Sequence, residues 1–201
     1  MTGIDKASYK YESAHPLFMT FKAVEMVAEL MALSGRTAPK GRGQDSIDIK
    51  VVAGEELKEL ARELFRLGEA RGIKIFLRDA GNLEDSQACL LMGSKAADSA
   101  GLDCGGCGFA TCKEMLEAQK QFLEKETEKP FHGPNCVIKM ADLGIALGSA
   151  AKTASLHNVD NRVMFTAGVA ALSLNWLEGC RVAYGLPLKA SGKSIYFDRP
   201  I

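Results

Sequence analysis

Three cysteines and four glycines crowd into residues 101–115, whose sequence is GLDCGGCGFATCKEM. Cys104, Cys107 and Cys112 form a C-x2-C-x4-C pattern, and Cys136 follows 24 residues after the third of them. Three closely spaced thiolates and a more distant fourth are the kind of ligand set that binds one iron–sulfur cubane. The spacing therefore predicts that these four cysteines hold a [4Fe–4S] cluster.

Gly105, Gly106 and Gly108 leave little side chain between the thiols. Because glycine has no Cβ, the backbone there can approach a cluster closely and direct amide N–H groups at its sulfur atoms. Such hydrogen bonds, together with burial and local charge, set the reduction potential. A helix beginning at Cys112 would also place its positive end beside an anionic cluster.

Zinc and disulfides are the alternative uses for these cysteines. A structural zinc site also takes four thiolates, but usually as two C-x2-C-type pairs, and the second pair is missing here. His132, four residues before Cys136, is either a surface histidine or a group that replaces a ligand or tunes the cluster. Cys89 and Cys180 lie in apolar segments, where free cysteine behaves as a small hydrophobic residue. We interpret both as buried structural thiols.

Composition limits the compartment and the partners. The N-terminal residues lack the basic segment followed by an apolar one that marks a secretory signal, and no apolar run reaches the roughly 18 residues of a membrane span. We therefore expect a cytoplasmic protein, in which cysteines bind metal or stay reduced. The 25 basic and 25 acidic side chains balance, so neither a nucleic acid nor a membrane surface is expected as a partner.

The chain has 201 residues, enough for one domain with or without a small insert, and 47% of them are hydrophobic, enough for a core. The elements that hydrophobic periodicity predicts do not alternate strictly, which indicates the α+β fold class. Within the apolar stretch 137–157, Gly144 and Gly148 would allow another backbone to come close. The predicted helices span 15–34, 55–71, 113–129, 137–157 and 163–176, and the predicted strands span 47–53, 73–79, 87–93 and 180–188.

Two polar segments each leave two interpretations open. The run HNVDNR, residues 157–162, either lines a ligand pocket or caps a helix and forms a turn. The C-terminal YFDRP, residues 196–200, either reaches across to a partner subunit or docks on its own domain.

Two resemblances to known families rest on these segments. DCGGCGFATCKEM, with the later GPNC, resembles the four-cysteine iron–sulfur module of corrinoid iron–sulfur proteins and of the B subunit of Rnf-type electron-transport complexes, over about residues 98–136. Nearly the whole chain is similar to a family of ferredoxin-domain proteins known by a domain-of-unknown-function label. That similarity runs through GRTAPKGRGQDSI, LDCGGCGFATC, DLGIALGSAAKTASLHNVDNRV and GLPLKASGKSIYFDR. It names a family without implying a reaction.

A weaker resemblance links the chain to flavin-dependent nitroreductases. It runs through helix 15–34, the loop APKGRGQD, strand 47–53, the apolar DLGIALGSAAKTA and the late strand VAYGLPL. It implies an α+β fold with a mixed sheet flanked by helices, built by residues 1–97 and 137–201. Residues 98–136 would be an inserted, small ferredoxin-like [4Fe–4S] module. It also implies a homodimer with FMN between the subunits.

The same resemblance implies where FMN would bind. Lys40, Gly43 and Asp45 stand where Ser, Asn and Gln contact the flavin in that family. Arg36, Lys40 and Arg42 are then the candidates to hold the FMN phosphate through charge-assisted hydrogen bonds, the alternative being that they are solvated loop charges. The Arg-rich segment that grips the phosphate in nitroreductases has no counterpart before residue 15.

The predicted activity is single-electron transfer, with a redox partner protein or a small-molecule electron acceptor. With a flavin present, the protein would be an oxidoreductase in which the flavin converts between one- and two-electron steps. The alternatives are a non-enzymatic electron carrier, an iron–sulfur sensor, or a zinc-stabilised interaction module without a redox role. The sequence identifies neither catalytic residues nor a substrate.

Overall fold

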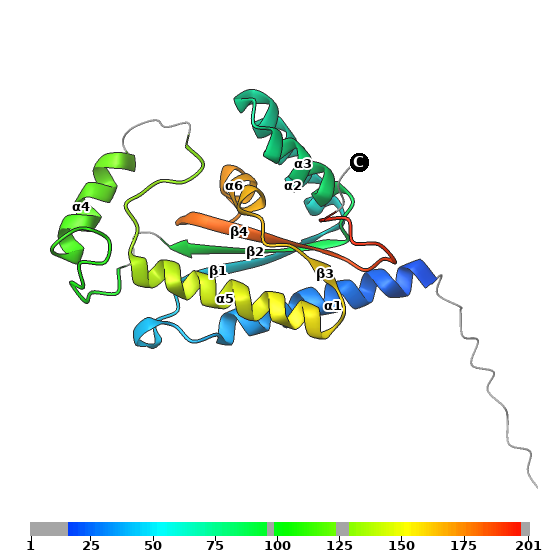
Figure 1. Ribbon diagram of the computed structural model, residues 1–201, viewed down its shortest axis with the longest axis horizontal. Helices are drawn as coiled ribbons and strands as arrows, with labels where there is room; N and C mark the ends of the chain where they lie inside the picture. Colours follow the sequence, from blue (N-terminus) through cyan, green and yellow to red (C-terminus); the bar gives the residue numbers. More distant parts are fainter. Residues whose placement is uncertain (1–15, 96–98, 124–128, 198–201) are drawn as a thin grey trace, which may run out of the picture.

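The computed structural model describes residues 16–95, 99–123 and 129–197 (Figure 1). Its central layer is a four-stranded sheet with the strand order β1-β2-β4-β3. Each described pair of neighbouring strands is antiparallel, so the sheet that we expected to be mixed is antiparallel throughout these strands. The strands are β1 (Ile47–Ala53), β2 (Ala88–Lys95), β3 (Asp160–Asn161) and β4 (Cys180–Lys189).

Helices cover both faces of the sheet (Figure 1). On one face, α1 (Pro16–Thr37) and α5 (Val137–Leu156) lie side by side. The other face carries α2 (Gly54–Arg71), α3 (Lys74–Glu84) and α6 (Phe165–Ser173). Helix α4 (Cys112–Leu123) lies apart from these layers, beyond one end of the sheet, at the left of Figure 1. The short 3-10 turn η1 (Gly41–Gly43) lies between α1 and β1.

Strand β2 shows how the sequence builds two cores. Ala88, Leu90 and Met92 pack with α1 and α5, whereas Cys89 and Leu91 pack with α2, α3 and α6. Successive side chains of a strand point to opposite faces, so a strand covered on both faces needs apolar residues at nearly every position. This explains the uninterrupted apolar run in β2, and the three layers confirm the α+β class with a helix-flanked sheet.

Most of the expected elements are confirmed, but the prediction of a strand at residues 73–79 is wrong. These residues lead into and form the first part of helix α3, in which the buried Phe76, Ala80 and Leu83 follow helical spacing. The short apolar run IKIFL suits a strand or a helix equally. The helical period shows only when the residues after Asp79 are included, because two turns of a helix need at least seven positions.

The segment with three of the four cysteines has a small core of its own. Helix α4 begins at Cys112, as expected, and is described as far as Leu123; the predicted continuation through residues 124–128 lies outside the described residues. The division into residues 1–97 with 137–201 and an insert at 98–136 stays a prediction. The small core consists of Ala100, Met115 and Cys136, with Cys107, Phe109, Leu116 and Ile138 packed against it.

Gly144 and Gly148 of α5 face outward. A Cβ atom at either position would meet no atom of the described chain within 4 Å. Within this part of the chain, therefore, no backbone makes the close approach that we expected there. None of the described helices combines the length and the hydrophobicity that a membrane span requires.

The described parts of both polar segments pack on their own domain; residues 198–200 of the C-terminal segment lie outside the described residues. After α5, Asn158 has a φ of 55°, and the N–H of Val159 donates to the carbonyl of Ala154 at 3.0 Å. Residues 157–162 therefore form a cap and a turn that leads into β3. Tyr196 is fully buried and shares a hydrogen bond of 2.9 Å with the hydroxyl of Ser86, so this part of the C-terminal segment docks on its own domain.

Candidate functional site

The four predicted cluster cysteines line one shallow hollow between α4 and the start of α5. Cys104 is exposed, Cys107 and Cys112 are half-buried, and Cys136 is only 7% exposed. The tertiary structure thus brings the distant fourth thiol to the same place as the first three. The other residues that line the hollow are Asp103, Gly105, Phe109, Thr111, Met115 and Val137.

Two side chains cap the N-terminus of α4 at the third cysteine. The backbone N–H of Cys112 donates to Oδ1 of Asp103 at 2.6 Å, and the N–H of Glu114 donates to Oγ1 of Thr111 at 3.2 Å. Thr111 and Glu114 have the spacing of a capping box, a signal in the sequence that our prediction of this helix did not use. These contacts satisfy N–H groups that would otherwise lack partners, and they fix the start of α4 at Cys112, which lines the hollow.

Gly106 sets how closely the cysteine loop approaches α5. A Cβ atom at this position would lie 2.6 Å from Cγ1 of Val137 and 3.6 Å from Sγ of Cys104. Any side chain there would push the loop away from the first residue of α5. We expected the backbone at this glycine to make a close approach beside the thiols. In the structure it makes a close approach to Val137, beside Cys104.

Cys136 is the residue directly before α5 and forms the N-cap of this helix. The segment that precedes it is held by Gln119 of α4, which is 1% exposed and donates from Nε2 to the carbonyl of Pro134 at 3.0 Å. Two helices thus begin at the hollow, one at Cys112 and one after Cys136. Their N-termini carry partial positive charge, which would stabilise an anionic group bound between them. We predicted that both helices begin here, but we expected a positive helix end beside the cluster only at Cys112.

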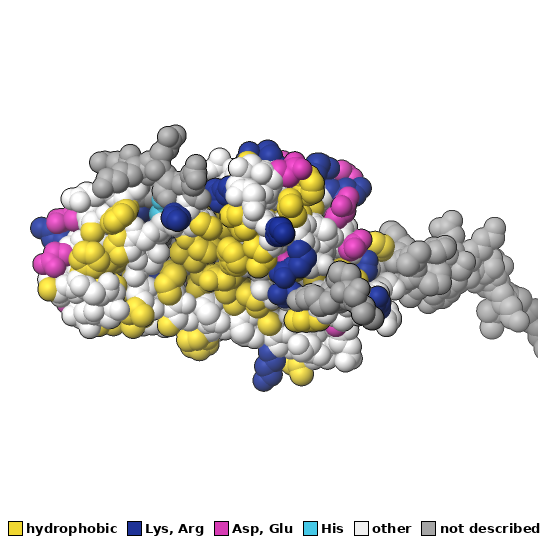
Figure 2. All heavy atoms as spheres, turned by 45° about the horizontal axis from the view of Figure 1, so that its top comes forward, with side chains coloured by type: hydrophobic (Ala, Val, Ile, Leu, Met, Phe, Trp, Pro, Cys, Tyr) yellow, Lys and Arg dark blue, Asp and Glu magenta, His cyan; other side chains and the backbone are white. Residues whose placement is uncertain are grey.

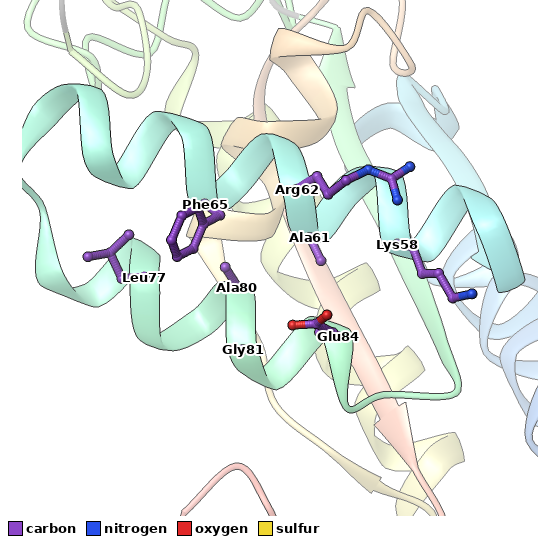
Figure 3. A pocket seen from close by; sticks show the side chains of 8 residues that line it. All are labelled: Lys58, Ala61, Arg62, Phe65, Leu77, Ala80, Gly81 and Glu84. Carbon is purple, nitrogen blue, oxygen red and sulfur yellow. The ribbon is translucent and has the colours of Figure 1, made fainter.

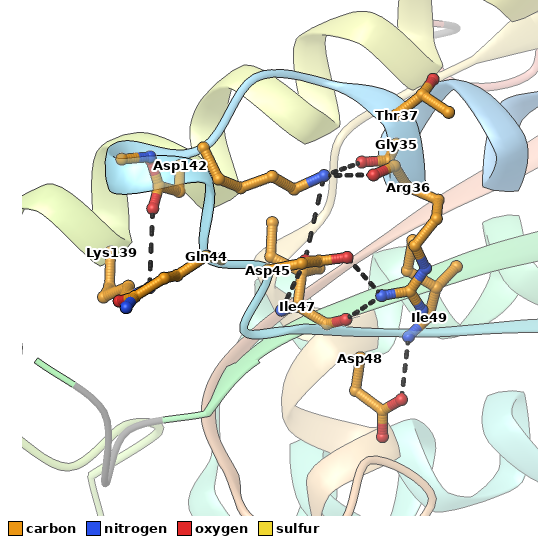
Figure 4. Close-up of polar contacts among 12 residues, drawn as sticks. Gly35, Arg36, Thr37, Gln44, Asp45, Ile47, Asp48, Ile49, Lys139 and Asp142 are labelled. Atoms are coloured by element: carbon orange, nitrogen blue, oxygen red, sulfur yellow. Dashed lines mark hydrogen bonds and ion pairs between the residues drawn. The ribbon is translucent and has the colours of Figure 1, made fainter. Parts of the chain in front are cut away.

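Two of the three candidates for the FMN phosphate contact their own loop (Figure 4). Nη1 of Arg36 donates to Oδ2 of Asp45 and to the carbonyl of Ile47, both at 2.7 Å. Nζ of Lys40, whose side chain is 5% exposed, donates to the carbonyls of Gly35 at 2.7 Å and Arg36 at 2.5 Å. These two cations complete the end of α1 through contacts with the chain itself.

These contacts favour the ionised form of Asp45. Burial by itself disfavours its charged form, but the hydrogen bond from Arg36 and the positive charge of Lys40 outweigh burial and lower its pKa below the ordinary value of 3.8. The third candidate, Arg42, is exposed and donates from Nη1 to the carbonyl of Ala100 at 3.0 Å. None of the three is simply a solvated loop charge, and their assignment to FMN stays a prediction.

A buried charge pair that the sequence analysis missed lies on α5 behind Cys136. Lys139 and Asp142 are each 3% exposed, with 4.0 Å between Nζ and Oδ2. Oδ1 of Asp142 accepts from the N–H of Gly41 at 2.8 Å, and Nζ of Lys139 donates to the carbonyl of Gln44 at 3.1 Å. The available signal was the presence of two charged residues on the face of α5 that otherwise carries Leu143, Ala146 and Ala150.

The other cysteines stand away from the hollow. Cys89 is fully buried in β2, and burial raises the pKa of its thiol far above the ordinary value. Cys180 at the start of β4 is half-buried; burial and the nearby carboxylate of Asp48 raise its pKa to about 11. Both are protonated at neutral pH and serve as packing residues. His132 is half-buried and is absent from the lining of the hollow.

Further hollows and hydrophobic surface lie outside the cysteine site. A groove of about 350 Å³ runs between α2 and α3, with Phe65 and Leu77 on its walls and Arg62 and Glu84 at its rim (Figure 3). A second hollow, of about 570 Å³, lies between α1 and the turn at His157. Figure 2 shows a broad hydrophobic area in the middle of the face it presents, with Lys and Arg side chains on its right side.

Comparison with known proteins decides the family. A protein of Archaeoglobus fulgidus is 43% identical over 178 residues, which cover 89% of this chain and 92% of that protein. A profile of the family described as "Uncharacterized protein containing a ferredoxin domain (DUF2148)" matches residues 132–199. The chain belongs to this family. The profile match includes Cys136 alone of the four cysteines in the hollow, whereas the similarity to the Archaeoglobus protein extends over most of the chain.

Solved structures show that this DUF2148 member has a nitroreductase-like fold. Nitroreductase CinD from Lactococcus lactis, in complex with nicotinic acid, has a TM-score of 0.54 at 11% identity, covering 90% of this chain and 95% of that one. The FMN-dependent nitroreductase NfnB from Mycobacterium smegmatis, in complex with NADPH, has a TM-score of 0.53 at 11% identity, covering 87% and 82%. A nitroreductase with bound FMN from Desulfitobacterium hafniense has 0.51 at 14%, covering 84% and 79%. At these identities the likeness establishes the fold alone.

Proposed function

We propose that this protein is an iron–sulfur redox protein that binds one [4Fe–4S] cluster through Cys104, Cys107, Cys112 and Cys136 and transfers single electrons. The observation that carries the proposal is the meeting of these four thiols in one hollow. A bound cluster supplies the one-electron chemistry. The chain supplies thiolate ligands, two helix N-termini and a glycine-lined approach.

The spacing of the donor side chains favours a cluster over a single zinc ion. Among the described residues, no three of the His, Cys, Asp and Glu side chains converge closely enough to hold one metal ion. In a cubane held by four cysteines each thiolate binds its own iron, so the ligands lie further apart than the four ligands of a tetrahedral zinc ion. The two positive helix ends favour the anionic character of a thiolate-ligated cluster.

Exposure defines where electrons would enter and leave. Cys104 and the glycines on either side of Cys107 are exposed, whereas Cys136 is buried against α4. A redox partner protein or a small acceptor would therefore approach the cluster from the loop of residues 101–108. The exposed Leu102 on this loop offers an apolar contact at that edge.

Purification without oxygen tests the proposal. The protein should be brown, with iron and sulfide in equal amounts, about four of each per chain, and an absorption band that bleaches on reduction. Cys107→Ser should lose the band and most of the iron. Cys180→Ser is the matched control, since this thiol lies outside the hollow, and it should retain both. Colourless protein with stoichiometric zinc would refute the redox function and support the interaction module.

A flavin-dependent oxidoreductase is the second candidate function. It is favoured by the fold shared with a nitroreductase that was solved with bound FMN. Arg36 and Lys40 bind groups of their own loop, so no role in the reaction is assigned to them. The spectrum of the purified protein distinguishes the two candidates, because a flavin adds resolved peaks that disappear on denaturation and extraction.

The homodimer that the nitroreductase resemblance implies is part of this proposal. Helices α1 and α5 leave Met26 66% exposed and Leu156 70% exposed, and Ile145 lies on the outer face of α5 with Gly144 and Gly148. Two glycines on one open helix face allow a second helix to pack closely. Covering this surface with a second copy would remove it from water.

A further inference from the structure

We propose that the loop of residues 40–44, hereafter the clamp loop, positions both chain segments that carry the cluster cysteines. This inference rests on the cluster proposed above. It gives Arg42, Gly41 and Gln44 a role that differs from the phosphate grip that we predicted for this loop. The clamp loop contacts the two segments separately, through a side chain on one side and through its backbone on the other. Figure 4 shows the backbone side, with Gln44 beside Lys139 and Asp142 of α5.

The first contact holds the segment that leads to Cys104. Nη1 of Arg42 donates to the carbonyl of Ala100, which is 3% exposed and belongs to the small core with Met115 and Cys136. The next residue, Gly101, has a φ of 63°, and a Cβ atom there would lie 3.4 Å from the guanidinium. The arginine therefore fits closely against the chain at the point where it turns into the cysteine loop.

The backbone of Arg42 itself supports a functional role. Its φ of 58° lies in the left-handed region, which costs a residue with a Cβ atom free energy that glycine would not lose. Such conformations persist where the surrounding contacts require them. The side-chain contact that could require arginine at this position is its hydrogen bond to Ala100.

The second contact holds the start of α5, where Cys136 is the N-cap. The N–H of Gly41 donates to Asp142, and Lys139 donates to the carbonyl of Gln44. A Cβ atom on Gly41 would lie 2.7 Å from Cγ2 of Ile138, so the loop lies directly on the first turn of the helix. This contact sets the position and the rotation of the helix that presents the fourth thiol.

The burial of the charge pair is consistent with positioning rather than with stability. Both side chains are 3% exposed, and Oδ2 of Asp142 has no hydrogen-bond partner in the described residues. Burying two charges costs desolvation free energy that a well-packed apolar pair would avoid, and such pairs are best understood where they specify one arrangement. Here the charge pair specifies how the clamp loop packs on α5.

The variant Arg42→Gly separates positioning from folding. Glycine adopts a positive φ without strain, so the cluster-free protein should unfold at the same temperature as wild type or higher. Without the guanidinium, the segment at Ala100 loses its tie, so a ferrous chelator should remove iron from the anaerobically purified protein on the order of tenfold faster, as for other groups that orient metal ligands. The midpoint potential of the cluster should shift as well.

Two companion variants complete the experiment. Arg42→Lys keeps a cationic donor on a shorter side chain. Its rate of iron loss should therefore lie between the rates of Arg42→Gly and wild type. Arg66→Ala, an exposed arginine on α2 that pairs with Glu63, is the matched control and should behave as wild type. Equal iron-loss rates and potentials in Arg42→Gly, Arg66→Ala and wild type would overturn the clamp while leaving the cluster intact. Wild-type protein without iron would overturn the cluster and the clamp together.

Discussion

The carboxylate of Asp103 accepts a hydrogen bond from the backbone N–H of Cys112, with 2.6 Å between Oδ1 and N. The residue directly before the first cysteine thus holds the third cysteine, across nine positions of the chain. Asp103 has a φ of 43°, which is uncommon for a residue with a Cβ atom. The contact makes the three closely spaced thiols one structural unit before any metal binds.

Removing this contact should loosen the cysteine loop. In Asp103→Ala, α4 loses an acceptor at its N-terminus, which typically costs about 1 kcal/mol of stability. The free energy of unfolding of the cluster-free protein, measured in urea, should fall by that amount, and iron bound per chain should fall with it. Asp103→Asn retains an acceptor oxygen and should remain close to wild type; a loss as large as that of Asp103→Ala would show that the charge matters instead.

Gly106→Ala tests the close packing of the loop on α5. The new Cβ atom would meet Val137 at 2.6 Å, so we expect iron retention to weaken on the order of tenfold. The double variant Gly106→Ala with Val137→Ala removes the clash and should recover most of the iron, a coupling expected only of residues in contact. Gly81→Ala, with open space around the glycine of α3, is the control. Failure of the double variant to recover would place the effect elsewhere.

The buried pair on α5 should be sensitive to the loss of one partner. Lys139→Met leaves the carboxylate of Asp142 buried without its counter-charge, which costs roughly 3–5 kcal/mol in comparable pairs. Adding Asp142→Asn removes the stranded charge and keeps an oxygen for the N–H of Gly41, so the double variant should recover part of the free energy of unfolding. Urea titrations of the cluster-free variants measure both values. Equal stability of the single and double variants would contradict a paired arrangement.

The stability of the folded protein at acid pH should depend on the ionised carboxylate of Asp45. Its pKa is lower in the folded chain than the ordinary value, so its ionised form stabilises the folded state above that value. This stabilisation is lost as the pH falls through the folded pKa, below about 4. Wild type should therefore lose more stability than Asp45→Asn over this range, as measured by the urea midpoint at each pH. Parallel curves for the two proteins would show that the pair with Arg36 contributes nothing.

The outer face of α5 should be needed for a dimer. Ile145→Glu places a charge between Gly144 and Gly148, and burying that charge against a second copy would be costly. We expect a halving of the mass measured by light scattering after gel filtration. Phe65→Glu, an equally exposed aromatic residue on the opposite layer, should leave the mass unchanged. A monomeric wild type would refute the dimer and leave the cluster proposal untouched.

Much of the fold followed from periodicity alone. In α2 the apolar positions recur at the helical period, and in β2 a short uninterrupted apolar run suits a strand buried on both faces, so the helix at 55–71 and the strand at 87–93 were predictable. The helix at residues 73–79 was not, because its apolar run IKIFL is shorter than two helical turns and carries no period of its own. The pairing of β2 with β4, which lie far apart in the sequence, depends on contacts that no local pattern encodes.

The candidate site divides in the same way. By itself the sequence determined which thiols are available and that glycines lie between them, since ligand type and spacing are properties of the chain. Only the tertiary structure decided that Cys136 joins them, because α4 and Gln119 must first fold the intervening segment back. The tertiary structure also decided that Arg36 and Lys40 bind groups of their own loop and that Arg42 binds the carbonyl of Ala100. A charged side chain binds the partners that folding places within reach, and a linear sequence does not specify those partners.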